Sequence, residues 1–369
     1  MFSNEKWFGA SADFYSETID QSLRFEDGDS PRLSKTFGSG GDRKNWTWSA
    51  WVKRGNISST QMLFHTFAQG GFGIEGFITF QSDDTITFQF DYNGGSHLRL
   101  RTNRVFRDTT NFYHLTFVAD SDNATQGDRL RIYVNGVRET SFSDENYPTN
   151  TTTDGSLNST YNHYISGRTN NSSFFDGYLA EINFLDGVAV TDTSGVLDEL
   201  VEIKNGVCIP KAYSGSYGTT GFRFTFADSG NLGDDTSGLS TPNDFASSGL
   251  ASTDVVSDSP TNTPSTFNRL YVDADSTPTY SEGNLRMDAT STSWFNATST
   301  FIQSSGKWYA EFYVSNVGTG AFIAIGTEKS SSTYLGSDSN AYGYHSASGN
   351  IYNNGSATAY GDTFTTGDV

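Results

Sequence analysis

The stretch FYHLTFVADSDNATQGDRLRIYVNGVR, residues 112–138, decides the fold of this chain. Apolar and polar residues alternate in residues 114–117 (HLTF) and again in residues 129–134 (RLRIYV). Because the side chains of a strand point alternately to opposite faces, each run predicts a strand with one apolar face and one solvent-facing face. The pair Asn135-Gly136 follows at once and tolerates the positive φ values of a type I′ turn. The stretch therefore predicts two strands joined by a polar loop, followed by a tight turn.

The composition of the whole chain also favours β structure. The chain has 369 residues, of which 35% are hydrophobic and 15% are aromatic, with 29 Phe, 19 Tyr and 6 Trp. Many short strands separated by polar loops have this composition, because each aromatic side chain buries a large area. Disordered chains are poor in aromatic residues, so disorder is excluded. We expect an all-β protein that is long enough for two domains.

Charge and cysteine content limit the partners. The formal net charge of −19 repels phosphate backbones, so we expect no nucleic-acid partner. Cys208 is the single cysteine, so no intrachain disulfide can form, and stability has to come from packing or oligomerisation. No apolar run is long enough for a membrane helix, and the N-terminal sequence has no secretory signal pattern, so we expect no membrane insertion. Release by cell lysis, as for virus particles, would fit an extracellular role.

The strand pattern divides the chain into four parts. Residues 1–20 are rich in aromatic residues and predict an arm that docks on its own domain or on a neighbouring subunit. Residues 21–190 predict a first β domain, residues 191–265 a helix (within 191–211) and an extended connector with one strand, Phe222–Phe226, and residues 266–369 an incomplete second β domain. Residues 146–160 predict a long exposed loop. The strands expected in the first domain are Ser22–Phe25, Trp46–Lys53, Met62–Ala68, Gly76–Gln81, Thr85–Tyr92, His97–Thr102, Tyr113–Ala119, Leu130–Asn135, Tyr164–Arg168 and Tyr178–Leu185.

Three motifs carry a resemblance to the concanavalin A-like jelly roll of laminin G-like domains. They are the 112–138 stretch, the tryptophan strand WTWSAWVK at residues 46–53, and FDGYLAEINF at residues 175–184. The second domain resembles a SPRY sandwich, through GKWYAEFYV (306–314), IAIG (323–326), YGYHSASGNIYNNG (342–355) and TFTTGDV (363–369). SPRY domains continue beyond this point with further strands, so we expect the chain to be a fragment of a longer one.

The whole arrangement resembles structural proteins of marine tailed bacteriophages. The resemblance rests on MFSNEKWFG (1–9), SLRFEDGDSPRLSKTF (22–37), NWTWSAWVKRG (45–55) and IPKAYSGSYGTTGFRFTFADSGNLGDD (209–235). It implies a virion appendage, fibre or capsid decoration on the exterior of the particle. The N-terminal arm would then contact other virion proteins.

Candidate binding residues lie in the loops of the first domain. Sugar sites combine an aromatic platform with amide and carboxylate groups, and Tyr161, Asn162, His163 and Asn170 offer such a combination. A calcium ion is a second expectation, with oxygen ligands from Asp120, Asp122 and Asn123. Asx residues form such turns without metal as well. The sequence also contains a local basic cluster, which either binds an acidic sugar or an acidic neighbouring subunit, or forms the solvent-facing side of a strand. Its members are Arg99, Arg101, Arg104 and Arg107.

The sequence lacks the pattern of a hydrolase of this fold. Retaining glycosidases need two carboxylates on one strand, and Glu181 has no acidic neighbour two residues away, which predicts a solvent-facing charge. The expectation is a non-catalytic virion structural protein that assembles as a homo-oligomer, most simply a trimer, and binds host-surface glycans. The alternatives are a secreted carbohydrate-active enzyme of jelly-roll fold and a purely architectural spacer without sugar binding.

Overall fold

The computed structural model describes residues 14–68, 74–90, 98–149, 154–271, 278–289, 294, 296–318, 320–326 and 334–369. The chain forms two compact units, Met1–Pro264 and Ser265–Val369. The described residues contain no α-helix, only three short 3-10 turns, η2 (Asp27–Asp29), η3 (Gln126–Asp128) and η4 (Ser252–Asp254). None of the described elements is a helix long and apolar enough to cross a membrane. The all-β prediction is confirmed.

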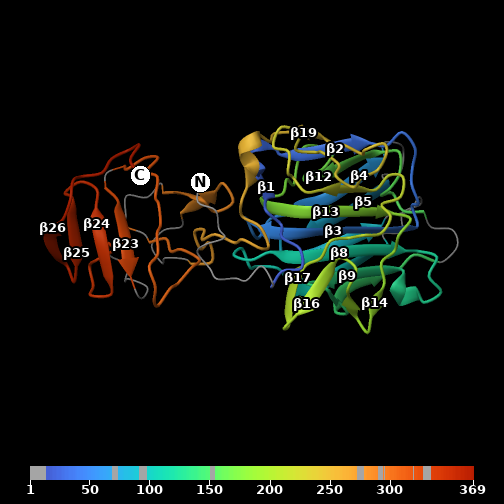
Figure 1. The fold of residues 1–369 in the computed structure, drawn as a ribbon, viewed down its shortest axis with the longest axis horizontal. Coiled ribbons are helices and arrows are strands. Elements are labelled where there is room, and N and C mark those ends of the chain that lie inside the picture. The colour runs from blue at the N-terminus through green and yellow to red at the C-terminus, as the bar shows by residue number, and fades with distance from the viewer. Residues whose placement is uncertain are drawn as a thin grey trace. The chain divides into compact units, whose positions relative to one another are not determined.

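Two antiparallel sheets build the first unit (Figure 1). The ten-stranded sheet has the order β14 (Asp192–Thr193), β15 (Val196–Leu197), β10 (Val137–Arg138), β9 (Leu130–Val134), β8 (Tyr113–Asp120), β3 (Asn45–Arg54), β13 (Gly177–Asp186), β1 (Ser22–Phe25) and β20 (Val255–Val256), with β18 (Phe222–Phe224) also paired to β13. The eight-stranded sheet has the order β11 (Phe142–Asn146), β7 (Arg99–Val105), β6 (Thr85–Phe90), β5 (Ile74–Phe80), β4 (Gln61–Ala68), β12 (Asn162–Ile165), β2 (Arg32–Thr36) and β19 (Ala246–Ser248).

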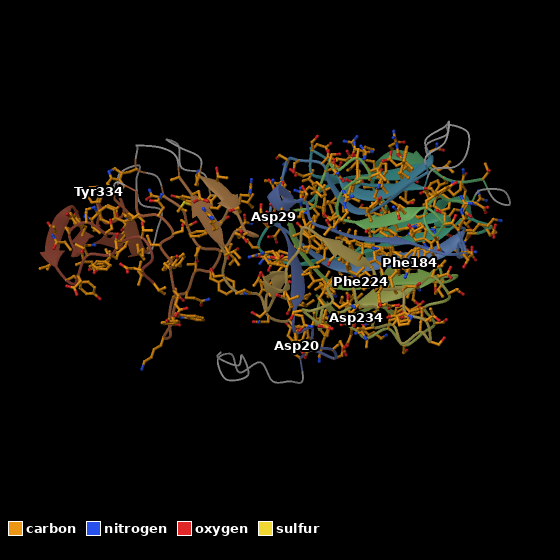
Figure 2. All side chains as sticks on the ribbon, turned by 90° about the horizontal axis from the view of Figure 1, so that it is seen from above. Asp20, Asp29, Phe184, Phe224, Asp234 and Tyr334 are labelled. Carbon is orange, nitrogen blue, oxygen red and sulfur yellow. The ribbon has the colours of Figure 1, made fainter. Side chains whose placement is uncertain are left out.

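The core between the sheets is aromatic. Trp46 of β3 is fully buried, and its ring centroid lies 5.6 Å from that of Phe88 and 6.2 Å from that of Phe90, both on β6 of the other sheet. Figure 2 labels two further core rings, Phe184 of β13 and Phe224 of β18, which are both fully buried. Such rings supply the burial that a chain with few aliphatic residues needs.

The hairpin predicted at Asn135-Gly136 is present. Asn135 has φ 51° and Gly136 has φ 75°, the two positive values that a type I′ turn requires. The turn joins β9 to β10, and the side chain of Asn135 accepts a hydrogen bond of 2.8 Å from the backbone N–H of His114. All ten strands expected in the first domain have counterparts, from β1 to β13. The second hairpin signal, Gly94-Gly95, lies outside the described residues.

The face of β8 and β9 that we expected to meet solvent is covered. His114, Thr116 and Tyr133 are all buried. Tyr133 packs with Leu197 and Leu200 in a second apolar cluster. These two leucines belong to residues 191–211, where the sequence predicted a helix. That prediction is wrong: the segment forms β14, β15 and the hairpin of β16 (Val201–Lys204) and β17 (Val207–Pro210). The apolar spacing reflected burial against the sheet rather than one face of a helix.

The expected connector is also part of the first unit. β18 pairs with β13, β19 pairs with β2, and β20 pairs with β1, so residues 222–256 extend both sheets. Further along, Lys53 of β3 donates a hydrogen bond of 2.7 Å to Asp258, and both side chains are buried. The composition predicted a connector because the segment is rich in residues with short polar side chains. In the structure, the carboxylates and amides of these side chains bind backbone groups inside the fold.

Residues 154–160 depart from the predicted exposed loop in the same way. Asn158 is fully buried, and its side-chain N–H group donates a hydrogen bond of 2.6 Å to Asp186. Asp186 also accepts hydrogen bonds from the backbone N–H groups of Thr219 (2.9 Å) and Thr220 (3.1 Å). Although burial opposes ionisation, these donors hold the pKa of Asp186 below its ordinary value. One carboxylate thus joins loops that are distant in sequence.

The second unit contains a hairpin and a four-stranded sheet. The hairpin is β21 (Thr279–Ser281) with β22 (Arg286–Asp288), and the sheet has the order β23 (Phe322–Gly326), β24 (Ala341–His345), β25 (Asn350–Asn353), β26 (Ser356–Ala359). The prediction of a strand at residues 306–314 is wrong. The segment pairs with no described strand, and Trp308 and Tyr309 are 48% and 73% exposed. Alternation favours a strand only where a sheet edge receives it. The SPRY-like fold of this unit stays a prediction.

Candidate functional site

The outer face of the eight-stranded sheet, the side turned away from the core, carries a continuous row of side chains. Along each strand the alternate residues Leu33, Phe64, Ile78, Phe88 and Leu100 point into the core, so their neighbours point outward. The strand registers place one outward residue from each strand side by side. The row is Ser34 (β2), Tyr164 (β12), His65 (β4), Phe77 (β5), Gln89 (β6) and Arg99 (β7).

A hydrogen-bonded cluster, which we call the Glu75 cluster, lies at the β4–β5 part of this face. The Oε1 atom of Glu75 lies 2.9 Å from Nε2 of His65 and accepts hydrogen bonds from Nη2 (2.6 Å) and Nε (3.0 Å) of Arg168. His65 is fully buried, and this burial lowers its pKa, so the imidazole is neutral. Burial opposes ionisation of Glu75, but the hydrogen bond from His65 and the charge of Arg168 hold its pKa below the ordinary value.

Aromatic rings lie beside the Glu75 cluster. Phe77 is 8% exposed, and the guanidinium carbon of Arg168 lies 5.8 Å from its ring centre. The hydroxyl of Tyr164 accepts a hydrogen bond of 3.1 Å from the side chain of Asn162. A Cβ atom at Gly167 would lie 2.6 Å from the ring of Phe174, so the absence of a side chain lets these two parts of the loop after β12 pack together. Tyr164 is also 8% exposed, so only a small part of each ring reaches the surface beside these hydrogen-bonding groups.

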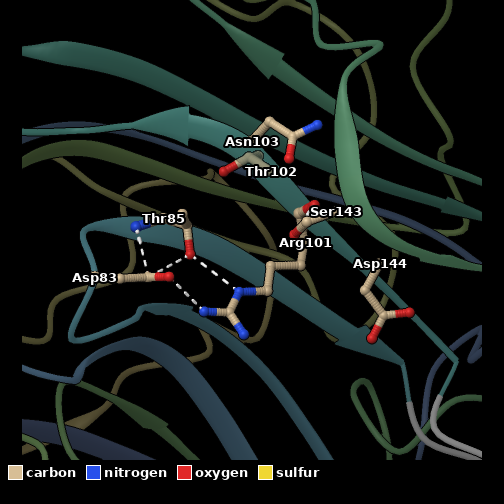
Figure 3. A pocket seen from close by; sticks show the side chains of 7 residues that line it. All are labelled: Asp83, Thr85, Arg101, Thr102, Asn103, Ser143 and Asp144. Atoms are coloured by element: carbon tan, nitrogen blue, oxygen red, sulfur yellow. Dashed lines mark hydrogen bonds and ion pairs between the residues drawn. The ribbon is translucent and has the colours of Figure 1, made fainter.

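A shallow depression of about 450 Å³ lies on the same face, over β6, β7 and β11 (Figure 3). Its lining residues are Asp83, Thr85, Arg101, Thr102, Asn103, Ser143 and Asp144. Arg101 reaches across it and donates hydrogen bonds to Asp83 (2.6 Å) and to the hydroxyl of Thr85 (3.2 Å). The hydrogen bond from the Thr85 hydroxyl is the main cause that holds the pKa of Asp83 below its ordinary value. Both groups of the pair are therefore charged.

The basic cluster of the sequence is paired with acidic side chains throughout. The ion pairs are Arg99–Asp144 (2.5 Å), Arg101–Asp83 (2.6 Å), Arg104–Glu139 (3.3 Å) and Arg107–Asp84 (2.8 Å). Arg99 and Arg101 belong to the outer face. The four arginines are thus not a row of free cations.

The four residues predicted as a sugar site do not come together. Asn162 lies on the outer face beside Tyr164, whereas Tyr161 is 37% exposed at the start of β12. Asn170 lies on the loop after β12, and its side-chain oxygen accepts a hydrogen bond of 2.7 Å from Ser172. His163 points into the core and is fully buried, and that burial lowers its pKa to about 3. A sugar site at these four residues stays a prediction.

The loop predicted to bind calcium is crossed by basic side chains. Asp120 accepts hydrogen bonds from Asn123 (2.8 Å) and Arg131 (3.4 Å). Asp122 pairs with Lys44 at 3.3 Å. A calcium ion would have to displace these donors. Calcium at this loop stays a prediction, which the change in melting temperature on addition of EDTA tests.

The structure brings together three carboxylates, which we call the acidic group, that the sequence did not predict. Carboxylate oxygens of Glu26, Asp27 and Asp176 all lie within 4.8 Å of one another, and Asp176 is buried. Three carboxylates are fewer than the roughly six to eight oxygen ligands that Ca²⁺ takes, so backbone oxygens or water would have to supply the others. The group comes from η2 and from the residue before β13, which are distant in sequence.

Glu181 is not the solvent-facing charge that we expected. It sits at a register shift of β13, has φ 46°, and its side chain is 13% exposed. Burial raises its pKa, although Arg223 donates to it a hydrogen bond of 2.5 Å. The register shift turns this side chain toward Arg223 of β18, which alternation alone does not predict.

Comparison with known proteins supports the fold of the first unit. A laminin G family model described as the concanavalin A-like lectin/glucanases superfamily matches residues 28–193. No curated protein matched the sequence. Among solved structures, the native heptameric SAP-like pentraxin of Limulus polyphemus is 16% identical, with 47% of this chain and 78% of that chain covered and a TM-score of 0.32.

Two further solved structures are similar at the same level. Domains LG4-5 of the mouse laminin α1 chain are 13% identical, with 46% of this chain and 42% of that chain covered and a TM-score of 0.32. The CBM40 module of a Ruminococcus gnavus IT-sialidase, bound to α2,3-sialyllactose, is 10% identical, with 45% and 95% covered and a TM-score of 0.33. The family match and the two antiparallel sheets lead to one conclusion: residues 28–193 form a laminin G-like domain with the concanavalin A-like jelly-roll fold.

Proposed function

We propose that this chain is a non-catalytic protein that binds glycans on the outer face of its eight-stranded sheet. The observation that carries the proposal is the row in which Phe77 and Tyr164 flank His65, next to Glu75 and Arg168. A sugar ring offers a C–H face that packs on an aromatic ring and hydroxyl groups that pair with carboxylate and guanidinium groups. The family description, which includes lectins, supports the same function.

On the ten-stranded sheet, the described residues include a segment that covers part of the outer side. The outer side of β8 and β13 is covered by residues 185–217, which bury Leu185 and Tyr133. On the eight-stranded sheet Phe77 and Tyr164 are each 8% exposed, whereas the side chains of Arg168 and Glu75 are 34% and 21% exposed. A glycan would therefore reach these two charged groups first.

We further propose that the protein is a virion component, a tail fibre, appendage or capsid decoration on the particle exterior, and that it assembles as a trimer. The resemblance of residues 1–9, 22–37, 45–55 and 209–235 to phage structural proteins supports this role. Residues 14–20 pack on their own unit: Ser16 donates a hydrogen bond of 3.0 Å to Pro210 O, and Lys204 one of 2.8 Å to Phe14 O. Contact with other virion proteins would then involve residues before Phe14.

The glycan proposal is tested by applying the full chain to an array of host-surface and algal polysaccharides. We expect concentration-dependent binding to at least one of them, lost in the double variant Phe77→Ala/Glu75→Gln. The control is Glu202→Gln on β16, which lies on the covering layer of the other sheet. Absence of binding to every polysaccharide would leave only the architectural role.

A second candidate function is glycoside hydrolysis at the acidic group. Retaining glycosidases place two carboxyl groups roughly 5–5.5 Å apart, and the oxygens of Glu26 and Asp176 lie within 4.8 Å. A reducing-end assay on the polysaccharides that bind distinguishes the two functions. The proposed function predicts no turnover, whereas turnover that is lost in Asp176→Asn would establish the enzyme.

A further inference from the structure

Arg32 of β2 lies over two aromatic rings at the edge of the Glu75 cluster. Its guanidinium carbon lies 4.8 Å from the ring centre of Tyr164 and 5.3 Å from that of Phe174. One of its N–H groups donates a hydrogen bond of 3.0 Å to the backbone oxygen of Arg168. Guanidinium groups stack on aromatic faces and are pre-organised by this stacking, so the orientation of the remaining donors is fixed.

This arginine has no acidic partner in the described part of the chain, in contrast to its neighbours. Arg99, Arg101 and Arg168 are paired with Asp144, Asp83 and Glu75. Within the described residues, the hydrogen bond to Arg168 O is the only one that the Arg32 side chain makes. None of its nitrogen atoms is both buried and without a partner, so its other donors reach solvent. Burial of the guanidinium removes part of its hydration and lowers the pKa of Arg32.

The charge around Arg32 differs from that of the rest of the protein. The chain has 23 basic and 42 acidic residues. On the described outer face, four arginines (32, 99, 101, 168) face three carboxylates (75, 83, 144), a balance of 4 − 3 = +1. The nearby His65 is neutral and adds no charge. A strongly acidic protein thus keeps one stacked, unpaired guanidinium on the face that we propose for glycans.

We propose that Arg32 binds an anionic substituent, a carboxylate or a sulfate ester, of an acidic polysaccharide. The inference rests on the glycan-binding function proposed above and specifies its ligand class. A guanidinium presents a rigid fork of N–H donors that matches the paired oxygens of either group, and such charge-assisted pairs are stronger than neutral hydrogen bonds. Phe77 and the Glu75 cluster would hold the sugar ring to which the anion is attached.

Isothermal titration of the full chain with two matched pairs of polymers tests this. Polygalacturonate is compared with its methyl ester, and dextran sulfate with dextran, so that each pair differs in charge but not in backbone. We expect the charged member of at least one pair to bind more tightly by roughly tenfold or more. A preference within the first pair assigns a carboxylate ligand, and a preference within the second assigns a sulfate.

Two variants of Arg32 test whether this residue causes the preference for the charged polymer. Arg32→Gln should abolish the preference. Arg32→Lys keeps the charge but loses the paired N–H donors of the guanidinium, so it should reduce the preference. Lys35→Gln removes the same charge from the same strand but lies outside the outer row, so it should bind as the wild type does. Thermal melting shows which variants are folded. If Arg32→Gln does not fold, Arg32→Lys is the variant that tests the preference for the charged polymer. Equal binding of charged and neutral polymers, or equal loss in Lys35→Gln and Arg32→Gln, would overturn the inference alone. A wild-type chain that binds a neutral polysaccharide of the array but none of these four polymers would also overturn the inference alone. Absence of binding to every polysaccharide tested would overturn the glycan function with it.

Discussion

The Oε1 atom of Glu75 lies 2.9 Å from Nε2 of His65, which joins β5 to β4 on the outer face of the eight-stranded sheet. The same oxygen accepts two hydrogen bonds from Arg168, which comes from the loop after β12. A carboxylate that accepts hydrogen bonds from an imidazole and a guanidinium at once fixes the orientation of both groups. The Glu75 cluster is therefore rigid before any ligand arrives, and this rigidity reduces the entropy lost on binding.

Replacement of Glu75 should affect binding more than stability. In Glu75→Gln the ion pair with the half-exposed Arg168 is lost, which costs about 0–1 kcal/mol of the free energy of unfolding. A hydrogen bond from a ligand hydroxyl to a carboxylate contributes roughly 1.5–3 kcal/mol, so affinity for the glycan should fall about 10- to 100-fold. Titration calorimetry measures the affinity, and Glu202→Gln is the matched control. Unchanged affinity in Glu75→Gln would remove this cluster from the binding site.

Stability should fall as the pH is lowered, because two buried histidines resist protonation. Burial lowers the pKa of His114 and of His163 to about 3. The unfolded-state value is about 6.5, so the unfolded chain takes up more protons below this pH and the stability present at neutral pH is lost progressively towards pH 3. Each histidine should account for about 2 kcal/mol between pH 7 and pH 5.

Denaturant unfolding across this pH range, followed by tryptophan fluorescence, measures the effect. His114→Gln removes one titrating group beneath Trp51, whose ring centroid lies 5.0 Å from that of the imidazole. The variant should therefore show a shallower dependence of unfolding free energy on pH than the wild type. Parallel dependences for the two proteins would contradict the burial of a neutral His114.

The buried pair of Lys53 and Asp258 should contribute strongly to the first unit. Removing one partner of such a pair leaves an unpaired buried charge and costs roughly 3–5 kcal/mol, so Asp258→Ala should be strongly destabilised. The double variant Lys53→Met/Asp258→Leu replaces both charges by apolar groups and should recover most of the loss. Thermal unfolding measures both. If Asp258→Ala melted like the wild type, residues 246–264 would not belong to the jelly roll.

The boundaries of the first unit give a related prediction. A fragment of residues 14–264 should fold, because it contains both sheets and the covering layer of residues 185–217. A fragment of residues 21–190 lacks β18, β19, β20 and most of that layer, and would expose Tyr133 and His114. Amide dispersion in NMR spectra should be native-like only for the longer fragment. A well-dispersed spectrum of the shorter one would restore the boundary expected from the sequence.

The sequence predicted the strands well because alternation is a local property. Residues 114–117 and the Asn135-Gly136 turn determine their own geometry, and both are found as expected. The covered face of β8 could not be predicted in this way, since Leu197 and Leu200 reach it from a segment distant in sequence. Their spacing fits a helix and two short strands equally well, and only the sheet beneath them decides.

The Glu75 cluster could not be predicted either, because it also depends on contacts between segments that are distant in sequence. His65 and Phe77 lie on predicted strands, but their neighbourhood depends on the register of β4 against β5 and β12, which contains a shift between Met62 and Phe64. Arg168 was placed at the end of a strand and belongs to the loop after it. Asn162 was identified because loop asparagines beside aromatic residues are typical of sugar sites, and it alone of the four predicted residues lies on the outer face.

Hydrogen–deuterium exchange of the full chain, with and without its tightest-binding polysaccharide, tests the central claim most directly. The glycan function predicts slower exchange in β4, β5 and β12 and in the loop that carries Arg168, because these elements form the proposed face. Exchange in the β16–β17 hairpin, which covers the other sheet, should not change. Protection confined to that hairpin or to the second unit, with none in β4, β5 or β12, would contradict the account.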